Sequence, residues 1–186
     1  MKKNTGSIFL MLLLISACKN KNKATDETPI SAVSIIQGQI NHLDTSLYQF
    51  TRYETVNGKT DTNWIKREEA KQLAADFLSM PDITQKGYFS QYTEERLIDA
   101  SLNTLSITAT AKKEDAEIQR QIIIINLDQT AEGKVSSIYI DRYKQIKDSL
   151  TEQKLFWEID KFFQIGNIIQ VKDQPEKSQL LKVAWQ

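Results

Sequence analysis

A stripe of apolar residues marks the first regular element of the chain, between residues 30 and 45. Its members recur every three or four positions, the spacing that places side chains on one face of a helix. They are Ile30, Val33, Ile36, Ile40, Leu43 and, just beyond the expected end of the helix, Leu47. A second stripe of the same period runs from residue 66 to residue 79 and stops before Pro81, which cannot continue a helix. The two patterns predict two helices that each bury one face.

Between these helices, residues 48–65 form two runs that are rich in β-branched and aromatic side chains. The runs are separated by Asn57-Gly58, a dipeptide typical of a two-residue hairpin turn, because both turn positions need positive φ. Pairing the runs outward from this turn places Thr51 opposite Trp64. The pattern therefore predicts a β-hairpin.

From residue 102 onward, apolar and polar residues alternate, which is typical of half-buried strands. The breakers between the strands are too short to hold a crossover helix, so neighbouring strands should be antiparallel. Residues 82–100 show no clear period and are expected to form a partly packed loop with a short helix. Gly166-Asn167 lies inside one strand and predicts a bulge or kink there. Six strands are predicted, at about 102–110, 122–125, 135–143, 155–159, 163–171 and 180–185.

These elements together predict an α+β fold, with two helices and a β-hairpin followed by a curved, roughly six-stranded antiparallel meander. Residues 30–186 contain no internal repeat and no shift in composition that would mark a second domain. We therefore expect residues 30–186 to form a single α+β domain.

The N-terminus carries a separate signal. Lys2 and Lys3 precede an apolar segment at residues 8–15, which is far shorter than the roughly 20 residues needed to span a bilayer. The segment ends in Ile15-Ser16-Ala17-Cys18, which resembles the lipobox of bacterial lipoproteins. In that family the cysteine is lipidated and becomes the first residue of the mature protein.

The resemblance implies that residues 1–17 are a lipoprotein signal peptide, cleaved between Ala17 and Cys18. Cys18 would carry the acyl chains that hold the protein on a membrane, and residues 18–29 would be the lipidated cysteine and a flexible tether. The residue after the cysteine is Lys19, not the Asp that retains enterobacterial lipoproteins in the inner membrane. We therefore expect a lipid-anchored protein of the cell envelope, at the outer membrane and facing the periplasm. The order of elements also resembles, in architecture only, the curved sheets with packed helices of several Gram-negative envelope lipoproteins.

Composition and charge exclude several classes of function. The chain has 24 Lys and Arg against 24 Asp and Glu, so it has no overall basic field for nucleic acid. Cys18 is the only cysteine, and its lipidation would leave no thiol for a metal site or a nucleophile. His42 is the only histidine, which argues against zinc hydrolysis. The six glycines form no phosphate-binding loop, and we expect no cofactor.

Two functions remain open. The first is a non-enzymatic module that binds an envelope protein partner or a small apolar ligand through the sheet. Its groove would be lined by aromatic residues if part of the concave face stayed uncovered, whereas a covered face would make them core. These residues are Trp64, Tyr139, Tyr143, Trp157 and Trp185.

The second function is an anchored glycan hydrolase with paired carboxylates and no metal. Glu158 and Asp160 would be roughly 6.6 Å apart along a strand, which falls in the range of glycosidase acids. Asp141 could lie on a neighbouring strand. A flat apolar patch of several hundred Å² would instead mark a structural subunit of an envelope complex.

Overall fold

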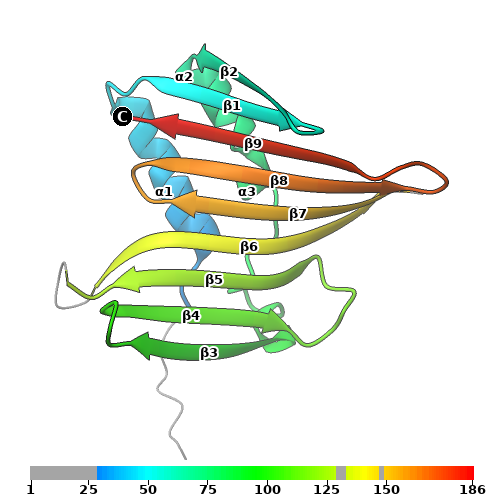
Figure 1. Cartoon of the computed structure of the whole chain (residues 1–186). Coiled ribbons are helices and arrows are strands. Elements are labelled where there is room, and N and C mark those ends of the chain that lie inside the picture. The colour runs from blue at the N-terminus through cyan, green and yellow to red at the C-terminus, as the bar shows by residue number, and fades with distance from the viewer. Residues whose placement is uncertain (1–28, 129–132, 147–148) are drawn as a thin grey trace, which may run out of the picture.

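A computed structural model describes residues 29–128, 133–146 and 149–186. Within these ranges the chain forms one antiparallel sheet of nine strands in the order β2-β1-β9-β8-β7-β6-β5-β4-β3 (Figure 1). The signal peptide, Cys18 and most of the tether predicted from the sequence lie outside the described residues. None of the helices in the described ranges is long and apolar enough to cross a membrane.

The helices come mainly from the first third of the described chain, and the strands fill the rest. The elements are α1 (Ala32–Thr45), β1 (Phe50–Val56), β2 (Lys59–Ile65), α2 (Arg67–Leu73), α3 (Ala75–Leu78), the 3-10 turn η1 (Phe89–Gln91), β3 (Tyr92–Asp99), β4 (Thr104–Ala111), β5 (Ile118–Asn126), β6 (Lys134–Ile146), β7 (Ser149–Glu158), β8 (Phe162–Val171) and β9 (Lys177–Trp185).

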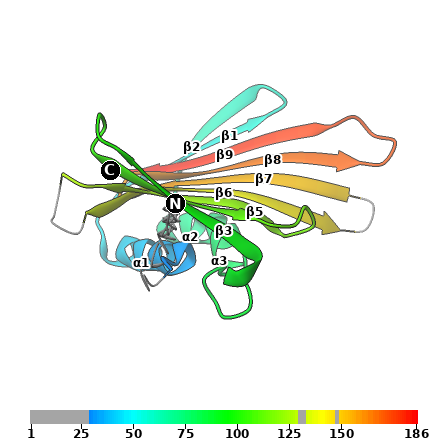
Figure 2. The same ribbon diagram turned by 90° about the horizontal axis from the view of Figure 1, so that it is seen from below.

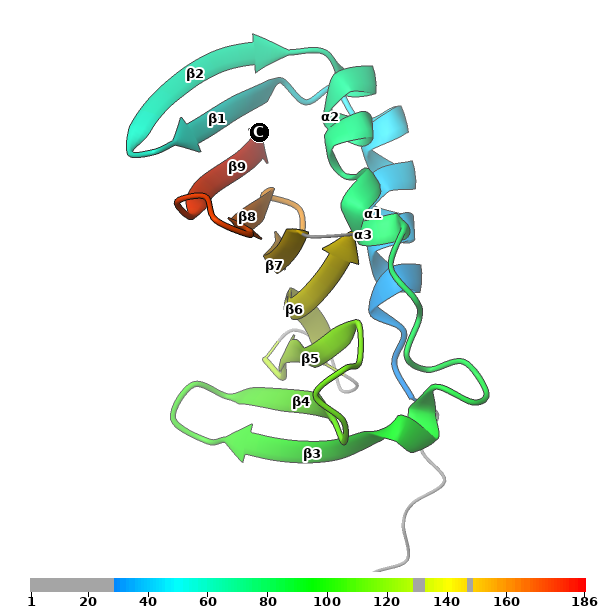
Figure 3. The same cartoon turned by 90° about the vertical axis from the view of Figure 1, so that its right-hand side faces the viewer.

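All three α-helices lie on one side of the sheet, as Figures 2 and 3 show from two directions. We call this side the helix face and the opposite side the open face. Successive residues of a strand point to opposite faces, so each strand contributes every second residue to the core. On β7, for example, Leu155 and Trp157 are buried beneath the helices, while Phe156 between them lies on the open face.

A cluster of aromatic rings fills the space between the helices and the sheet. The ring of Phe77, from α3, meets the indole of Trp157 edge-on at 5.1 Å and the ring of Phe163 at 5.7 Å. Trp157 and Phe163 are opposite each other on β7 and β8 and stack at 5.2 Å. Phe77 therefore anchors the short helix α3 to the centre of the sheet.

Two local predictions are confirmed. The β1–β2 hairpin has the register read outward from its turn, with Thr51 opposite Trp64. Asn57 and Gly58 have φ of 49° and 81°, the positive values that the turn requires. The first helix covers nearly the predicted range, and the Ser31 hydroxyl caps it by accepting a hydrogen bond from the Ser34 amide at 3.0 Å.

The predicted fold class is wrong. The chain is mostly one nine-stranded antiparallel sheet rather than two helices and a hairpin beside a six-stranded meander. The hairpin is not a separate unit, because β1 pairs with β9 and so extends the sheet. Residues 92–99, expected to be loop, form the edge strand β3. The charged run Glu94-Glu95-Arg96 breaks the apolar alternation there, and β3 is held instead by backbone pairing with β4.

Two smaller expectations also differ from the structure. The β8 register runs through Gly166-Asn167 without a shift, and the irregularities lie instead between β5 and β6. The second predicted helix is divided at Ala74 into α2 and α3. In α3, Phe77 packs in the aromatic core and Asp76 bonds to a residue of the sheet.

Candidate functional site

The five aromatic residues predicted to line a groove lie on two different faces. Trp157 and Trp185 are buried on the helix face, with exposed fractions of 0 % and 5 %. Trp64, Tyr139 and Tyr143 belong to the open face, because they alternate with residues that point toward the helices. These five residues therefore do not form one groove.

On the open face, aromatic rings are combined with charged side chains. Lys182 Nζ lies 4.0 Å from the centre of the Phe162 ring, and Arg120 lies over the Tyr139 ring at 5.6 Å. The Tyr139 hydroxyl donates a 2.5 Å hydrogen bond to Asp141. Burial, followed by this hydrogen bond, raises the pKa of Tyr139 above its ordinary value of 10.0.

The carboxylates considered for glycan hydrolysis are each engaged separately. Glu158 pairs with Lys161 at 2.7 Å, and Asp141 pairs with Arg120 at 2.8 Å. Asp160 does not lie on the strand but in the turn after β7, and in this turn it accepts a hydrogen bond from Gln39. Each of these carboxylates therefore has a partner of its own.

His42 lies in the last turn of α1, as the sequence predicts, and its ring contacts the Tyr48 ring edge-on at 6.2 Å. Among the described residues, no group of three or more His, Asp or Glu side chains is placed to hold a metal ion.

A row of polar residues crosses the helix face where the apolar core ends. On β8, Phe163 and Ile165 belong to the core, and Asn167 is the next residue on the same face. The neighbouring strands change from apolar to polar at the same level. We call this set the polar row; the strand pairing places its members side by side in the order Arg142, Gln153, Asn167 and Gln179.

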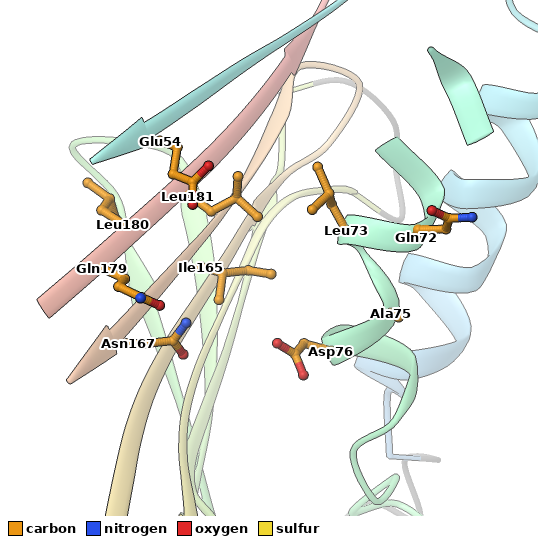
Figure 4. A pocket seen from close by; sticks show the side chains of 10 residues that line it. All are labelled: Glu54, Gln72, Leu73, Ala75, Asp76, Ile165, Asn167, Gln179, Leu180 and Leu181. Carbon is orange, nitrogen blue, oxygen red and sulfur yellow. The ribbon is translucent and has the colours of Figure 1, made fainter. Parts of the chain in front are cut away.

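A cavity of about 330 Å³ lies where the polar row meets the helices (Figure 4). One wall comes from α2 and α3, and the other comes from β1, β8 and β9. Figure 4 shows the carboxylate of Asp76 facing Asn167 across the opening. The lining residues are Glu54, Gln72, Leu73, Ala75, Asp76, Ile165, Asn167, Gln179, Leu180 and Leu181.

Hydrogen bonds fix Asp76 at the floor of this cavity. Lys144 Nζ lies 2.6 Å from Oδ1 of Asp76, and Gln153 Nε2 donates to Oδ2 at 2.9 Å. The same Gln153 nitrogen lies 3.0 Å from Oδ1 of Asn167. Two strands, β6 and β7, thus hold one carboxylate of α3, so the position of Asp76 is set by the sheet.

Arg142 secures the helix from the other side. It is a buried cation that donates to the backbone carbonyl of Asp76 at 3.1 Å and binds the Glu117 carboxylate at 2.5 Å. A charge-assisted bond of this kind is about twice as strong as a neutral one. Arg142 and Gln153 thus hold α3 against the sheet at the floor of the cavity.

Gln153 has a further property. Its side chain is only 3 % exposed, and its Oε1 atom accepts no hydrogen bond from any residue that the structure describes. A buried acceptor without a partner costs about 1–3 kcal/mol. The amide nitrogen of Gln153 bonds to both Asp76 and Asn167, so this amide lies behind two residues that line the cavity, although Gln153 is not itself one of the lining residues.

Sequence reasoning did not identify this site. Asp76 is one acidic residue on a predicted helix, and the partners of its carboxylate, Lys144 and Gln153, come from two strands far along the chain. The polar row did leave a signal, since Arg142, Gln153 and Asn167 interrupt the apolar alternation of their strands. These interruptions indicate a site only when the strand register shows that the three residues are neighbours.

Comparison with known proteins found no matching family model, no matching curated protein and no matching solved structure.

Proposed function

We propose that this chain is a lipoprotein of the bacterial cell envelope that acts by binding rather than by catalysis. The support for the anchor is the lipobox-like Ile15-Ser16-Ala17-Cys18 after a short apolar segment. In this proposal Cys18 holds the protein at the outer membrane, and the sheet faces the periplasm.

The observation that carries the binding function is the cavity beside Asp76. Ligand sites are typically concave and mainly apolar, with a few polar groups held in fixed positions. Here Leu73, Ile165 and Leu181 supply apolar walls, and Asp76 is held from two strands. A floor that is already ordered avoids part of the entropy cost of binding. A small ligand with an apolar part fits these walls better than a protein partner does.

Native mass spectrometry of the full chain, extracted from the membranes of a Gram-negative host, tests the binding function. The wild-type protein should retain a small molecule that Ala75→Phe loses, because Ala75 is exposed and lines the cavity. The matched control is Ala100→Phe, at an exposed alanine away from the cavity. Equal spectra for wild type and Ala75→Phe would contradict the proposal.

The anchor has its own test. Cys18→Ser should move the protein from the membrane fraction to the soluble fraction, because no acyl chain can then be attached. A neighbouring substitution, Lys19→Ser, should leave the membrane fraction unchanged. If Cys18→Ser stayed in the membrane after a carbonate wash, the lipoprotein assignment would be wrong.

A further inference from the structure

We propose that the cavity beside Asp76 binds a primary ammonium group carried on a short aliphatic chain. This inference rests on the proposed binding function and names the chemistry of its ligand. A free aliphatic amine and the side chain of a lysine share this chemistry.

The charge of the cavity lining favours a cation. Glu54 and Asp76 both line it, and the lining contains no Lys or Arg. Two bases outside the lining are already paired with carboxylates: Lys144 bonds to Asp76, and Arg52 bonds to Glu69 and lies 3.9 Å from Glu54. An anionic ligand would meet two carboxylates with no available base.

The hydrogen-bonding capacity of the floor favours a donor. A carboxylate has about four acceptor positions, and the structure uses one on each oxygen of Asp76. An ammonium group has three donors and no acceptor, so it matches a floor with unused acceptors.

The walls favour an aliphatic body. Leu73 and Ile165 face each other from α2 and β8 above the Asp76 carboxylate, as Figure 4 shows, and Leu181 borders Ile165. No aromatic side chain lines the cavity, so it offers no stacking platform for a sugar ring. A volume of about 330 Å³ accommodates a chain of several carbons.

The test is calorimetric titration of the full chain in phosphatidylcholine nanodiscs, with protein-free nanodiscs subtracted. The probes are pentylammonium, 1-pentanol and pentanoate, which share one carbon chain and differ in charge. Pentylammonium should bind at least tenfold more tightly than either of the others. Equal or tighter binding of pentanol or pentanoate would overturn the inference.

Two variants locate the bound amine. Asp76→Asn should weaken pentylammonium binding about tenfold, as loss of a charged hydrogen bond does. Because Asp76 also holds the fold, Glu54→Gln is the decisive variant: its carboxylate makes only a 3.9 Å contact with Arg52, and we expect about threefold weaker binding. Glu69→Gln, which removes a nearby carboxylate outside the cavity lining, is the matched control and should change nothing. An unchanged affinity in Glu54→Gln would place the amine elsewhere and overturn the inference.

A fourth probe, Nα-acetyl-lysine methylamide, separates the two sources of the amine. Tighter binding than pentylammonium would identify a lysine of a protein, and weaker binding would identify a free amine. If none of the amines binds while the wild-type chain still retains a ligand that Ala75→Phe loses, the amine inference fails and the binding function stands.

Discussion

Lys144 and Asp76 form an ion pair of 2.6 Å between strand β6 and helix α3, across 68 positions of the sequence. Lys144 and Gln153 both belong to the sheet, and together they hold the carboxylate of Asp76, which lies on a helix of only four residues. Beyond the apolar core, the helices are thus held to the sheet by polar contacts.

Replacing Asp76 should destabilise the fold. Asp76→Ala leaves the half-buried Lys144 and the amide nitrogen of Gln153 without their carboxylate, and the expected loss in the free energy of unfolding is about 1–3 kcal/mol. Urea denaturation measures this loss. Glu54→Ala removes the other carboxylate of the cavity lining and should cost less than about 0.5 kcal/mol, because Glu54 holds no second element in place. Equal losses in the two variants would show that the Asp76 contacts contribute nothing.

The Phe77 ring should contribute more to stability than any ring on the open face. Phe77→Ala opens a cavity against Trp157 and Phe163, and we expect a loss of about 3–5 kcal/mol. Phe156→Ala, on the open face, leaves a site that solvent can fill and should cost about half as much. Thermal unfolding of both variants by circular dichroism makes the comparison. A smaller loss for Phe77→Ala would mean that α3 is not packed as described.

After burial, Asp141 should be the main cause of the raised pKa of Tyr139. Asp141→Asn removes a negative charge from beside the hydroxyl, so the pKa of Tyr139 should fall toward its ordinary value. Tyr92 is the internal control: burial, followed by the charge of Glu117, raises its pKa, and Asp141 is not among the causes. The chemical shift of the ring carbon Cζ, followed by NMR against pH, reports both tyrosines.

The same shift gives a pH dependence of stability. The pKa of Tyr139 is higher in the folded chain than the ordinary value of 10.0, so the protonated hydroxyl stabilises the fold fully below pH 10. This contribution is lost as the pH rises through the folded pKa. Tyr139→Phe should therefore show less loss of stability above pH 10 than the wild-type chain does. An identical decline in both proteins would assign the alkaline instability to other groups.

Two glycines should respond in opposite directions to alanine. Gly38 lies in α1 with no atom near its added Cβ, so Gly38→Ala should raise the free energy of unfolding by about 0.5–1 kcal/mol. Gly58 has φ of 81° in the hairpin turn, and Gly58→Ala should lower the free energy of unfolding by about 1 kcal/mol. Guanidinium denaturation of the pair provides the measurement. The same sign in both would contradict the turn geometry.

Features that depend on local sequence could be predicted, whereas features that depend on contacts between distant residues could not. The β1–β2 hairpin was predictable with its register, because Asn57-Gly58 alone specifies the turn. The pairing of β1 with β9 was not, since Phe50 and Trp185 come from distant parts of the chain and no spacing relates them. The edge strand β3 was missed because Leu97 and Ile98 are about two-thirds exposed, which removes the burial on which the alternation depends.

The cavity could not be predicted from the sequence for a related reason. In the sequence, Asp76 resembles any polar residue of an amphipathic helix. Its place in the cavity is apparent only from its bond to Gln153, which in turn bonds to Asn167, and both residues come from later strands. The predicted aromatic groove failed because Trp157 and Tyr139 are on opposite faces, which requires the register of β6 against β7.

The place of β9 in the sheet has a consequence for the order of assembly. The last strand to be synthesised lies between β1 and β8, so it joins the earliest hairpin to the rest of the sheet. Until residues 177–185 have emerged, β1–β2 and β3–β8 remain two separate sheets, each with an unpaired edge that invites pairing with other chains. Closure also depends on the pairing of β1 with β9, which are far apart in the sequence, and pairing over such a separation is a slow folding step. A chain truncated before Lys177 would lack this joining strand while retaining the helices and every other strand.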